Sequence, residues 1–142
     1  MAPATTTQVD WNSIFRTATT GSFGGTTTSG SYADLSGSPT DNVSVIVPAS
    51  GKIDIRFSGV VWNNSAGQFS WMSVVLSGAN SISAGSIVLA VDKQAVTGEK
   101  TISYVFEGVG LTPGLTNIKC KWSVGGGTAT WSNSRLSAQP IL

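Results

Sequence analysis

The sequence predicts an all-β protein, an antiparallel β-sandwich with jelly-roll wiring and an extended N-terminal arm. Apolar and polar residues alternate with a period of two in many short segments, and no segment has a convincing helical pattern. From Tyr32 onward, turn signals rich in Gly, Pro and Asn recur about every 8–12 residues, the spacing typical of sandwiches and barrels. With 142 residues the chain suits one domain. We expect the arm at residues 1–31 and the jelly-roll domain at residues 32–142.

The stretch from Asn42 to Trp62 has the clearest pattern. Residues 43–47 alternate Val with Ser and Ile, and residues 53–57 alternate Ile or Phe with Asp and Arg. The intervening Pro-Ala-Ser-Gly is typical of a turn, because Pro48 cannot donate to a strand ladder and Gly51 accepts a positive φ. The stretch therefore predicts an antiparallel hairpin with one apolar face.

The remaining strands are predicted by the same alternation, with a soft connection over residues 78–85. In residues 115–124 it places Ile118, Cys120, Trp122 and Val124 inside. Cys120 is the only cysteine, so no intrachain disulfide forms, and we interpret it as a buried small apolar residue. The predicted strands cover residues 68–76, 87–91, 101–107, 115–124, 128–131 and 135–141.

The N-terminal arm is rich in Thr, Ser and Gly and contains one apolar cluster, formed by Trp11, Ile14 and Phe15. Their spacing aligns them on a single helical turn that Asp10 would cap. Two interpretations remain open. The cluster packs on its own domain as a first strand, or it docks on a neighbouring subunit or a larger lattice.

Two predicted strands are apolar on both faces, which a two-layer sandwich with one interior does not require. A second cover is needed, either the N-terminal arm folded back or a neighbouring copy. Since large exposed apolar areas usually mark interfaces, we predict an oligomer. The interface candidates are Phe69, Trp71 and Val75 on one face, Met72, Val74 and Leu76 on the other, and Val88 in the next strand.

Composition argues against several functions. Only 11% of the residues are charged, against about 25% in typical domains, and the net charge is +1, so nucleic acid is not an expected partner. The N-terminus does not resemble a signal peptide, and no apolar run is long enough for a membrane helix, so we expect synthesis in a cytoplasm and no membrane partner. The chain has no histidine, and no acids have metal-loop spacing. Asp54 and Glu107 are interpreted as solvated sheet surface. We expect no enzyme activity, no metal and no cofactor.

Two tryptophans could form a glycan platform, because aromatic rings stack on sugars while amide side chains bond to hydroxyls. Trp62 precedes Asn63 and Asn64, and Trp131 lies two residues before Asn133. The alternative is that each ring caps an open end of the sandwich.

Several segments are similar to a known family, the small jelly-roll virion proteins of tailed bacteriophages, especially those of actinobacterial hosts. The resemblance covers roughly residues 30–142. It lies in the segments Tyr32–Leu35, Val43–Lys52, Leu111–Gly114 and Trp131–Leu136.

This resemblance implies a homotrimer of the complement and tumour-necrosis-factor type that serves as a capsid decoration or tail-fibre module. It brings no catalytic residues. Because a fibre shaft and a collagen-like repeat are missing, it favours a decoration protein of the virion, assembled in the host cytoplasm. That protein would bind the major capsid protein and stabilise the lattice. The alternative is a tail receptor-binding or baseplate module that contacts host glycans.

Overall fold

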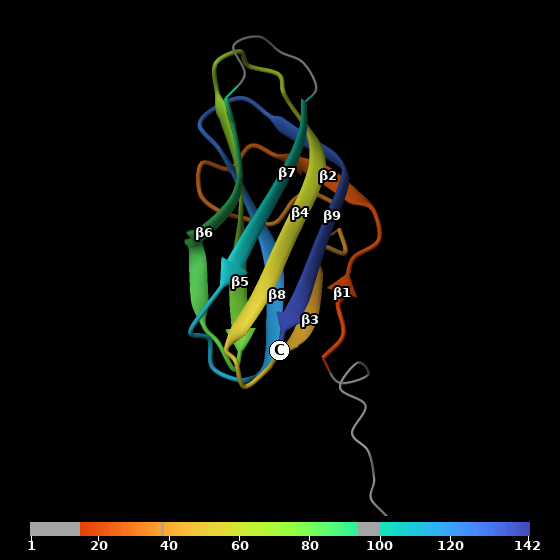
Figure 1. The fold of residues 1–142 in the computed structure, drawn as a ribbon. Helices are drawn as coiled ribbons and strands as arrows, with labels where there is room; N and C mark the ends of the chain where they lie inside the picture. The colour runs from red at the N-terminus through yellow and green to blue at the C-terminus, as the bar shows by residue number, and fades with distance from the viewer. Residues whose placement is uncertain (1–14, 38, 94–99) are drawn as a thin grey trace, which may run out of the picture.

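The chain folds into two antiparallel sheets packed face to face, so the predicted β-sandwich is confirmed (Figure 1). A computed structural model describes residues 15–37, 39–93 and 100–142. These residues contain no helix, and therefore none that is long and apolar enough to cross a membrane. The strands are β1 (Ala18–Thr19), β2 (Phe23–Thr27), β3 (Asn42–Val47), β4 (Lys52–Asn63), β5 (Phe69–Gly78), β6 (Ile82–Lys93), β7 (Lys100–Gly108), β8 (Gly114–Val124) and β9 (Ala129–Ile141).

The wiring is that of a jelly roll. The first sheet has the order β1-β9-β4-β7, with β2 also paired to β9, and the second has the order β3-β8-β5-β6. Each strand pair is antiparallel, and β4 pairs with β9 on one side and β7 on the other. In Figure 1, β7, β4 and β9 form the front layer, with β5 and β8 behind them. The edges of the sandwich are therefore β7 and β6 on one side, and β1, β2 and β3 on the other.

Between the sheets lies a single core centred on three aromatic residues. Trp122 of the second sheet packs against Phe57 and Trp131 of the first, with ring centroids 5.7 and 4.8 Å apart. All three are almost fully buried, as are the aliphatic residues that alternate along β4 and β8. The predicted inward positions Ile118, Cys120, Trp122 and Val124 are confirmed. Burial raises the pKa of the Cys120 thiol well above its usual range, so the thiol stays protonated.

The predicted hairpin over residues 42–62 is wrong in its pairing, although its turn and its apolar faces are present. The amide of Gly51 donates to the carbonyl oxygen of Pro48 at 2.9 Å, and Gly51 has a φ of 69°. However, β3 pairs with β8 in one sheet and β4 with β7 and β9 in the other. The turn therefore crosses from sheet to sheet, and the two apolar faces meet across the core. A period of two reveals which face is buried, but two facing sheets bury the same pattern as a hairpin does.

The N-terminal segment was expected to be an extended arm as far as residue 31, and the structure places part of it inside the sandwich. Both β1 and β2 pair with β9, and Phe23 is buried with its ring centroid 6.0 Å from that of Trp122. Backbone pairing of Gly- and Thr-rich segments gives little periodic apolar signal, which explains the error. Trp11 and Ile14 lie outside the described residues.

The two predicted C-terminal strands form one long strand, β9, interrupted by an irregularity at Asn133. This residue has a φ of 47°, and the register with β4 shifts between Ser58 and Val60. Such a bulge accommodates one extra residue without ending the strand. The soft connection predicted over residues 78–85 is also shorter than expected, because β6 begins at Ile82.

Replacing the central tryptophan should destabilise the fold strongly. We expect Trp122→Ala to lower the free energy of unfolding by about 3–5 kcal/mol, since it leaves a cavity between the sheets. The matched control is Trp62→Ala, whose side chain is 38% exposed and should cost less than about 1 kcal/mol. Urea denaturation followed by circular dichroism measures both. Equal losses would contradict a core centred on Trp122.

Candidate functional site

The outer face of the second sheet carries an exposed apolar surface formed by Phe69, Trp71, Val88 and Val91, which we call the outer patch. Phe69, Val88 and Val91 are 36, 39 and 41% exposed, and Trp71 is half-buried. The register pairs Trp71 of β5 with Val91 of β6, and Ser73 with Val88. Since directly paired residues in antiparallel strands share a face, the four side chains lie together on the surface.

The aromatic half of the outer patch is held in a fixed arrangement. The rings of Phe69 and Trp71 are stacked, with centroids 5.2 Å apart and an interplanar angle of 10°. The Nζ atom of Lys93 lies 5.1 Å from the centroid of the Phe69 ring, a cation–π contact. Rings that are already packed lose little rotamer entropy when a partner covers them, which favours binding.

Another part of this outer face is covered by the chain itself. Residues 83–86 of β6 form an irregularity in the pairing with β5, where the register passes from Val74 to Leu76. The amide of Gly85 donates to Oγ of Ser73 at 2.8 Å, and that hydroxyl donates to the carbonyl oxygen of Ile87 at 2.6 Å. Ser73 is fully buried as a result.

Tyr32 completes this cover. A Cβ atom added at Gly85 would lie 3.2 Å from the Tyr32 ring, closer than an ordinary contact, and the φ of 92° also favours glycine at this position. Burial raises the pKa of the Tyr32 phenol, and a hydrogen bond with Ser123 partly offsets this effect. The second cover that the sequence requires is therefore supplied in part by residues 32 and 83–86, and the outer patch is what they leave exposed.

The structure divides the seven predicted interface residues into two groups. Met72, Val74 and Leu76 belong to the core and are at most 2% exposed, so they cannot contact a partner. Phe69, Trp71, Val75 and Val88 face outward and are exposed or half-buried.

Val91 was missed by the sequence reasoning because β6 does not alternate strictly. A register shift lies between Met72 and Ser73, opposite Ala90 and Val88. Leu89 and Ala90 are consequently both buried, and Val88 and Val91 both point outward.

Phe15 is the one member of the predicted docking cluster among the described residues. It lines an open cleft of about 290 Å³ with Pro48, Ala49, Ser50 and Leu142, at the end of the sandwich where β3 turns into β4. This position is next to the C-terminus.

The predicted glycan platform is not assembled. Trp131 is 1% exposed and belongs to the core, whereas Trp62 lies on the outer face of the first sheet. Asn63 is also fully buried, where its amide donates to Ser70 Oγ and to the carbonyl oxygen of Gly126, both at 3.1 Å. The Oδ1 atom of Asn64 accepts the amide of Thr128 at 2.8 Å, and Asn133 is exposed at the bulge of β9. Of the two tryptophans of the predicted platform, only Trp62 presents its ring to solvent.

A buried carboxylate that the sequence did not single out, that of Asp41, holds the chain just before β3 against β8. Asp41 is fully buried, with Lys119 Nζ 2.6 Å from Oδ1 and Trp122 Nε1 3.2 Å from Oδ2. Burial alone would lower the pKa of Lys119, but its hydrogen bond and attraction to Asp41 outweigh burial and raise it. Asp41 thus ties the central tryptophan to the segment that carries Tyr32.

Asp34 extends this ion-pair network to the surface. Its Oδ1 atom lies 2.8 Å from Lys121 Nζ and 3.4 Å from Lys119 Nζ. The hydrogen bond from Lys121 lowers the pKa of Asp34, burial opposes this effect, and attraction to both lysines adds to it, so the pKa is lowered overall. On the first sheet, Asp54 and Glu107 face each other in register, with Asp54 3.7 Å from Arg56.

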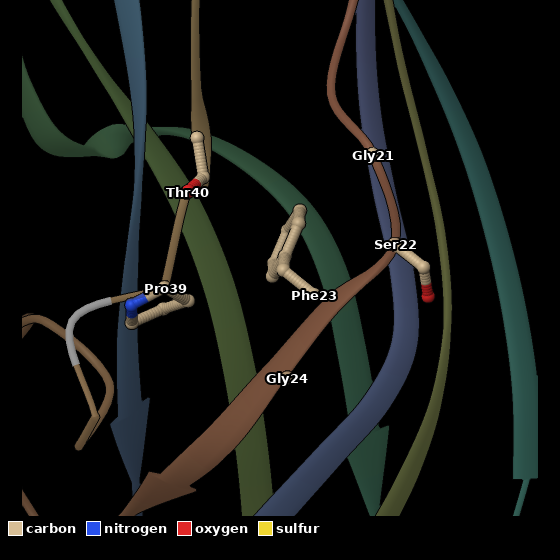
Figure 2. Close-up of a pocket in the computed structure, with 6 residues that line it drawn as sticks. All are labelled: Gly21, Ser22, Phe23, Gly24, Pro39 and Thr40. Atoms are coloured by element: carbon tan, nitrogen blue, oxygen red, sulfur yellow. The ribbon is translucent and has the colours of Figure 1, made fainter.

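A shallow groove of about 460 Å³ separates the start of β2 from the segment that precedes β3 (Figure 2). Gly21, Ser22, Phe23 and Gly24 line one wall, and Pro39 and Thr40 line the other. The Phe23 ring points into the space between the two segments, and the Ser22 hydroxyl points away from it. None of the lining residues is charged, and no group of His, Cys, Asp or Glu among the described residues could hold a metal.

No family model and no curated protein matches this chain. Similar solved structures include the infectious bursal disease virus Gx strain, with a TM-score of 0.59 and 15% identity over 88% of this chain and 32% of that chain. The Gt strain gives a TM-score of 0.59 and 13% identity, over 89% of this chain and 33% of that one. Eiger TNF from S. frugiperda gives 0.55 and 11%, over 91% of this chain and 94% of that one.

These similarities confirm the jelly-roll class and show the fold alone. The chain spans about a third of the virus chains and nearly all of the TNF chain. They include a virus structure and a TNF, and nothing in them indicates a tailed bacteriophage.

Removing the buried carboxylate should loosen the segment that covers the outer face. We expect Asp41→Asn to lower the free energy of unfolding by about 1–3 kcal/mol, because charge-assisted hydrogen bonds to Lys119 and Trp122 are weakened. The control Asp34→Asn changes a side chain that is 54% exposed and should cost less than about 1 kcal/mol. Urea denaturation at neutral pH compares the two, and a larger loss for Asp34→Asn would contradict this assignment.

Asp34 should also make stability depend on pH. Because its pKa is lowered in the folded state, its contribution is present above the unfolded pKa of about 3.9 and is lost as the pH falls through the folded value. We expect the free energy of unfolding of the wild type to fall more steeply than that of Asp34→Asn below about pH 4. Urea titrations across this range measure the difference. Parallel curves would show that Asp34 has no favourable partner.

Proposed function

We propose that this chain is a non-enzymatic structural protein of a virion. In the specific form that we favour, it is a capsid decoration protein of a tailed bacteriophage that binds the major capsid protein as a homotrimer. Assembly would take place in the host cytoplasm, with no cofactor and no nucleic acid or membrane as partner. The jelly-roll fold, which occurs in a virus structure and a TNF, is compatible with this role but does not select it.

The observation that carries the proposal is the outer patch. Phe69, Trp71, Val88 and Val91 form an apolar surface on rigid strands, in a chain that covers the neighbouring part of the same face with Tyr32. Aromatic residues are enriched at the centres of protein interfaces, and charged residues are depleted there. A standard interface buries roughly 800 Å² on each partner, which is more surface than four side chains provide. We therefore assign these four residues to the centre of a larger interface.

Decoration would stabilise the capsid by mass action. A protein that binds only the assembled lattice lowers the free energy of the assembled state, by an amount that grows with its concentration above the dissociation constant. In a trimer, three identical patches bind together, and the second and third contacts form at a high effective concentration. A modest single contact then suffices for firm attachment.

The tail receptor-binding alternative has less support. Its glycan platform needed both tryptophans, and Trp131 is buried in the core. Trp62 alone, 38% exposed beside the polar side chains of the first sheet, offers one stacking face. The decoration role instead uses the outer patch, all four residues of which lie on the surface of the described structure.

Charges placed in the outer patch should abolish capsid binding. We expect the double variant Val88→Asp/Val91→Asp to bind empty capsids of the encoding virus at least about tenfold more weakly than the wild type, since a buried carboxylate without a partner opposes association. Co-sedimentation with capsids assembled without the chain measures the affinity and the copy number.

The matched control is Leu115→Asp, a residue 58% exposed at the start of β8 and outside the outer patch. It should bind like the wild type. Hundreds of bound copies per particle in multiples of three would support decoration by trimers. Binding by the double variant that equals that of the control would overturn the proposed role of the patch.

A further inference from the structure

Within the part of the chain that the structure describes, one side of the edge strand β7 is without a strand partner along its whole length. The strand pairs with β4 on its other side, from Ile53–Gly108 to Val61–Lys100, without any shift of register. A strand at the edge of a sheet presents a row of unpaired amide and carbonyl groups to anything that approaches.

The other edges of the sandwich carry features that hinder pairing, whereas the central residues of β7 do not. Two register shifts interrupt β6, β1 has two residues, and β2 has a shift of its own. The edge of β3 faces Arg16, Thr17 and Ala18 across a cleft. By contrast, residues 101–106 of β7 include no glycine, proline or charged residue. Natural proteins protect a long regular edge when it is meant to stay free.

Exposed apolar side chains follow the same edge. Tyr104 is 42% exposed and Val105 is 60% exposed, and Phe106 is half-buried. Tyr104 lies directly opposite Phe57 and so belongs to the face that looks toward the core, while Val105 lies opposite Arg56 on the outer face. On the core-facing side of the first sheet, Tyr104 of the edge strand β7 is therefore still partly exposed, because no further described strand covers it.

We propose that β7 pairs with β7 of a second copy of this chain, antiparallel and about a two-fold axis through Tyr104. The two five-stranded sheets would then join into one continuous sheet. Strand addition of this kind obtains affinity from main-chain hydrogen bonds and specificity from the alternating side chains. A two-fold contact needs only one surface, provided that this surface is complementary to itself.

The register centred on Tyr104 makes the strand complementary to itself over its whole length. An axis on a residue keeps core faces with core faces, whereas an axis between two residues would turn every side chain to the wrong face. Tyr104 is the central residue of the nine in β7, so the axis through it pairs all nine. Ile102 then faces Phe106 of the second copy, and the two Tyr104 rings meet at the axis.

The charges near the edge are also compatible with this register. On the outer face, Glu107 lies opposite Thr101 of the second copy, and Ser103 lies opposite Val105. The nearest charged residues of the adjoining strand, Asp54 and Arg56, are paired with Glu107 and Val105 of their own copy. Across the contact between the two copies, no two like charges lie directly opposite one another, an arrangement that would destabilise the pair.

This inference goes beyond the proposed virion role and does not depend on it. If the chain also forms trimers, each trimer has three free β7 edges, and two-fold pairing connects one trimer to another. On a closed shell, neighbouring three-fold positions are related by two-fold axes, so such contacts would link the bound trimers to each other. If the chain forms no trimer, the same contact gives a dimer.

The mass of the purified full-length chain tests the pairing. We expect wild-type protein at micromolar concentration to have at least twice the weight-average mass of Tyr104→Lys in sedimentation equilibrium, because two lysines would meet at the axis. Val109→Lys is the control, since Val109 is 63% exposed but lies beyond the end of β7, and it should keep the wild-type mass. Capsid binding is not involved, so this result is separate from that of the proposed function.

Cysteine cross-linking tests the register and covers the case in which Tyr104→Lys misfolds. Under mild oxidation, Tyr104→Cys should form a disulfide-linked dimer rapidly, because paired residues at the axis are about 4.5–5.5 Å apart. Val109→Cys should not, and the native Cys120 is buried and unreactive. The inference is overturned if wild type and Tyr104→Lys have equal mass, or if Val109→Cys cross-links as fast as Tyr104→Cys.

Discussion

The packing of Trp122 between Phe57 and Trp131 is the contact on which the rest of the structure depends. It is the place where the two sheets meet through their largest side chains, with T-shaped and tilted ring pairs of 4.8–5.8 Å. Trp122 also donates its indole proton to the buried Asp41, which in turn holds Lys119. The core is thereby tied to Asp41, and backbone hydrogen bonds between Trp122 and Ala33 hold the segment that carries Tyr32. One residue of β8 thus contacts both the opposite sheet and the segment that covers part of the second sheet.

The sequence predicted which faces are buried far better than which strands pair. Alternation placed Ile53, Ile55 and Phe57 inside correctly, because burial of a face leaves a period of two in any antiparallel sheet. The same alternation carries no information on the partner, which explains how β3 and β4 were predicted as a hairpin when they belong to opposite sheets. The prediction that Trp131 belongs to a surface glycan platform was wrong for a related reason. The bulge at Asn133 keeps β9 continuous, so a residue expected to lead into a turn lies within a strand, and its ring is buried in the core.

For the candidate site, the useful signal was an excess of apolar residues over what one interior can bury. It identified Phe69, Trp71 and Val88 as outward residues in need of a cover, and these are exposed or half-buried. Its limit is that the cover can come from the chain itself. The bulge at residues 83–86 and the Tyr32 ring depend on one glycine conformation, Gly85 with a φ of 92°, and on a contact between residues far apart in sequence. Neither leaves a periodic pattern.

The edges and the outer patch follow from one property of an open sandwich. Closure into a barrel would remove all edges, whereas two separate sheets leave four, and each must be bent, shortened, covered or paired. This chain bends β6 and shortens β1, and bending β6 is also what turns Val88 and Val91 to the same side. The device that protects one edge therefore creates the apolar patch beside it. The neighbouring edge, β7, stays regular, so the side of the sandwich formed by β6 and β7 holds both the outer patch and the edge that we propose as contact surfaces.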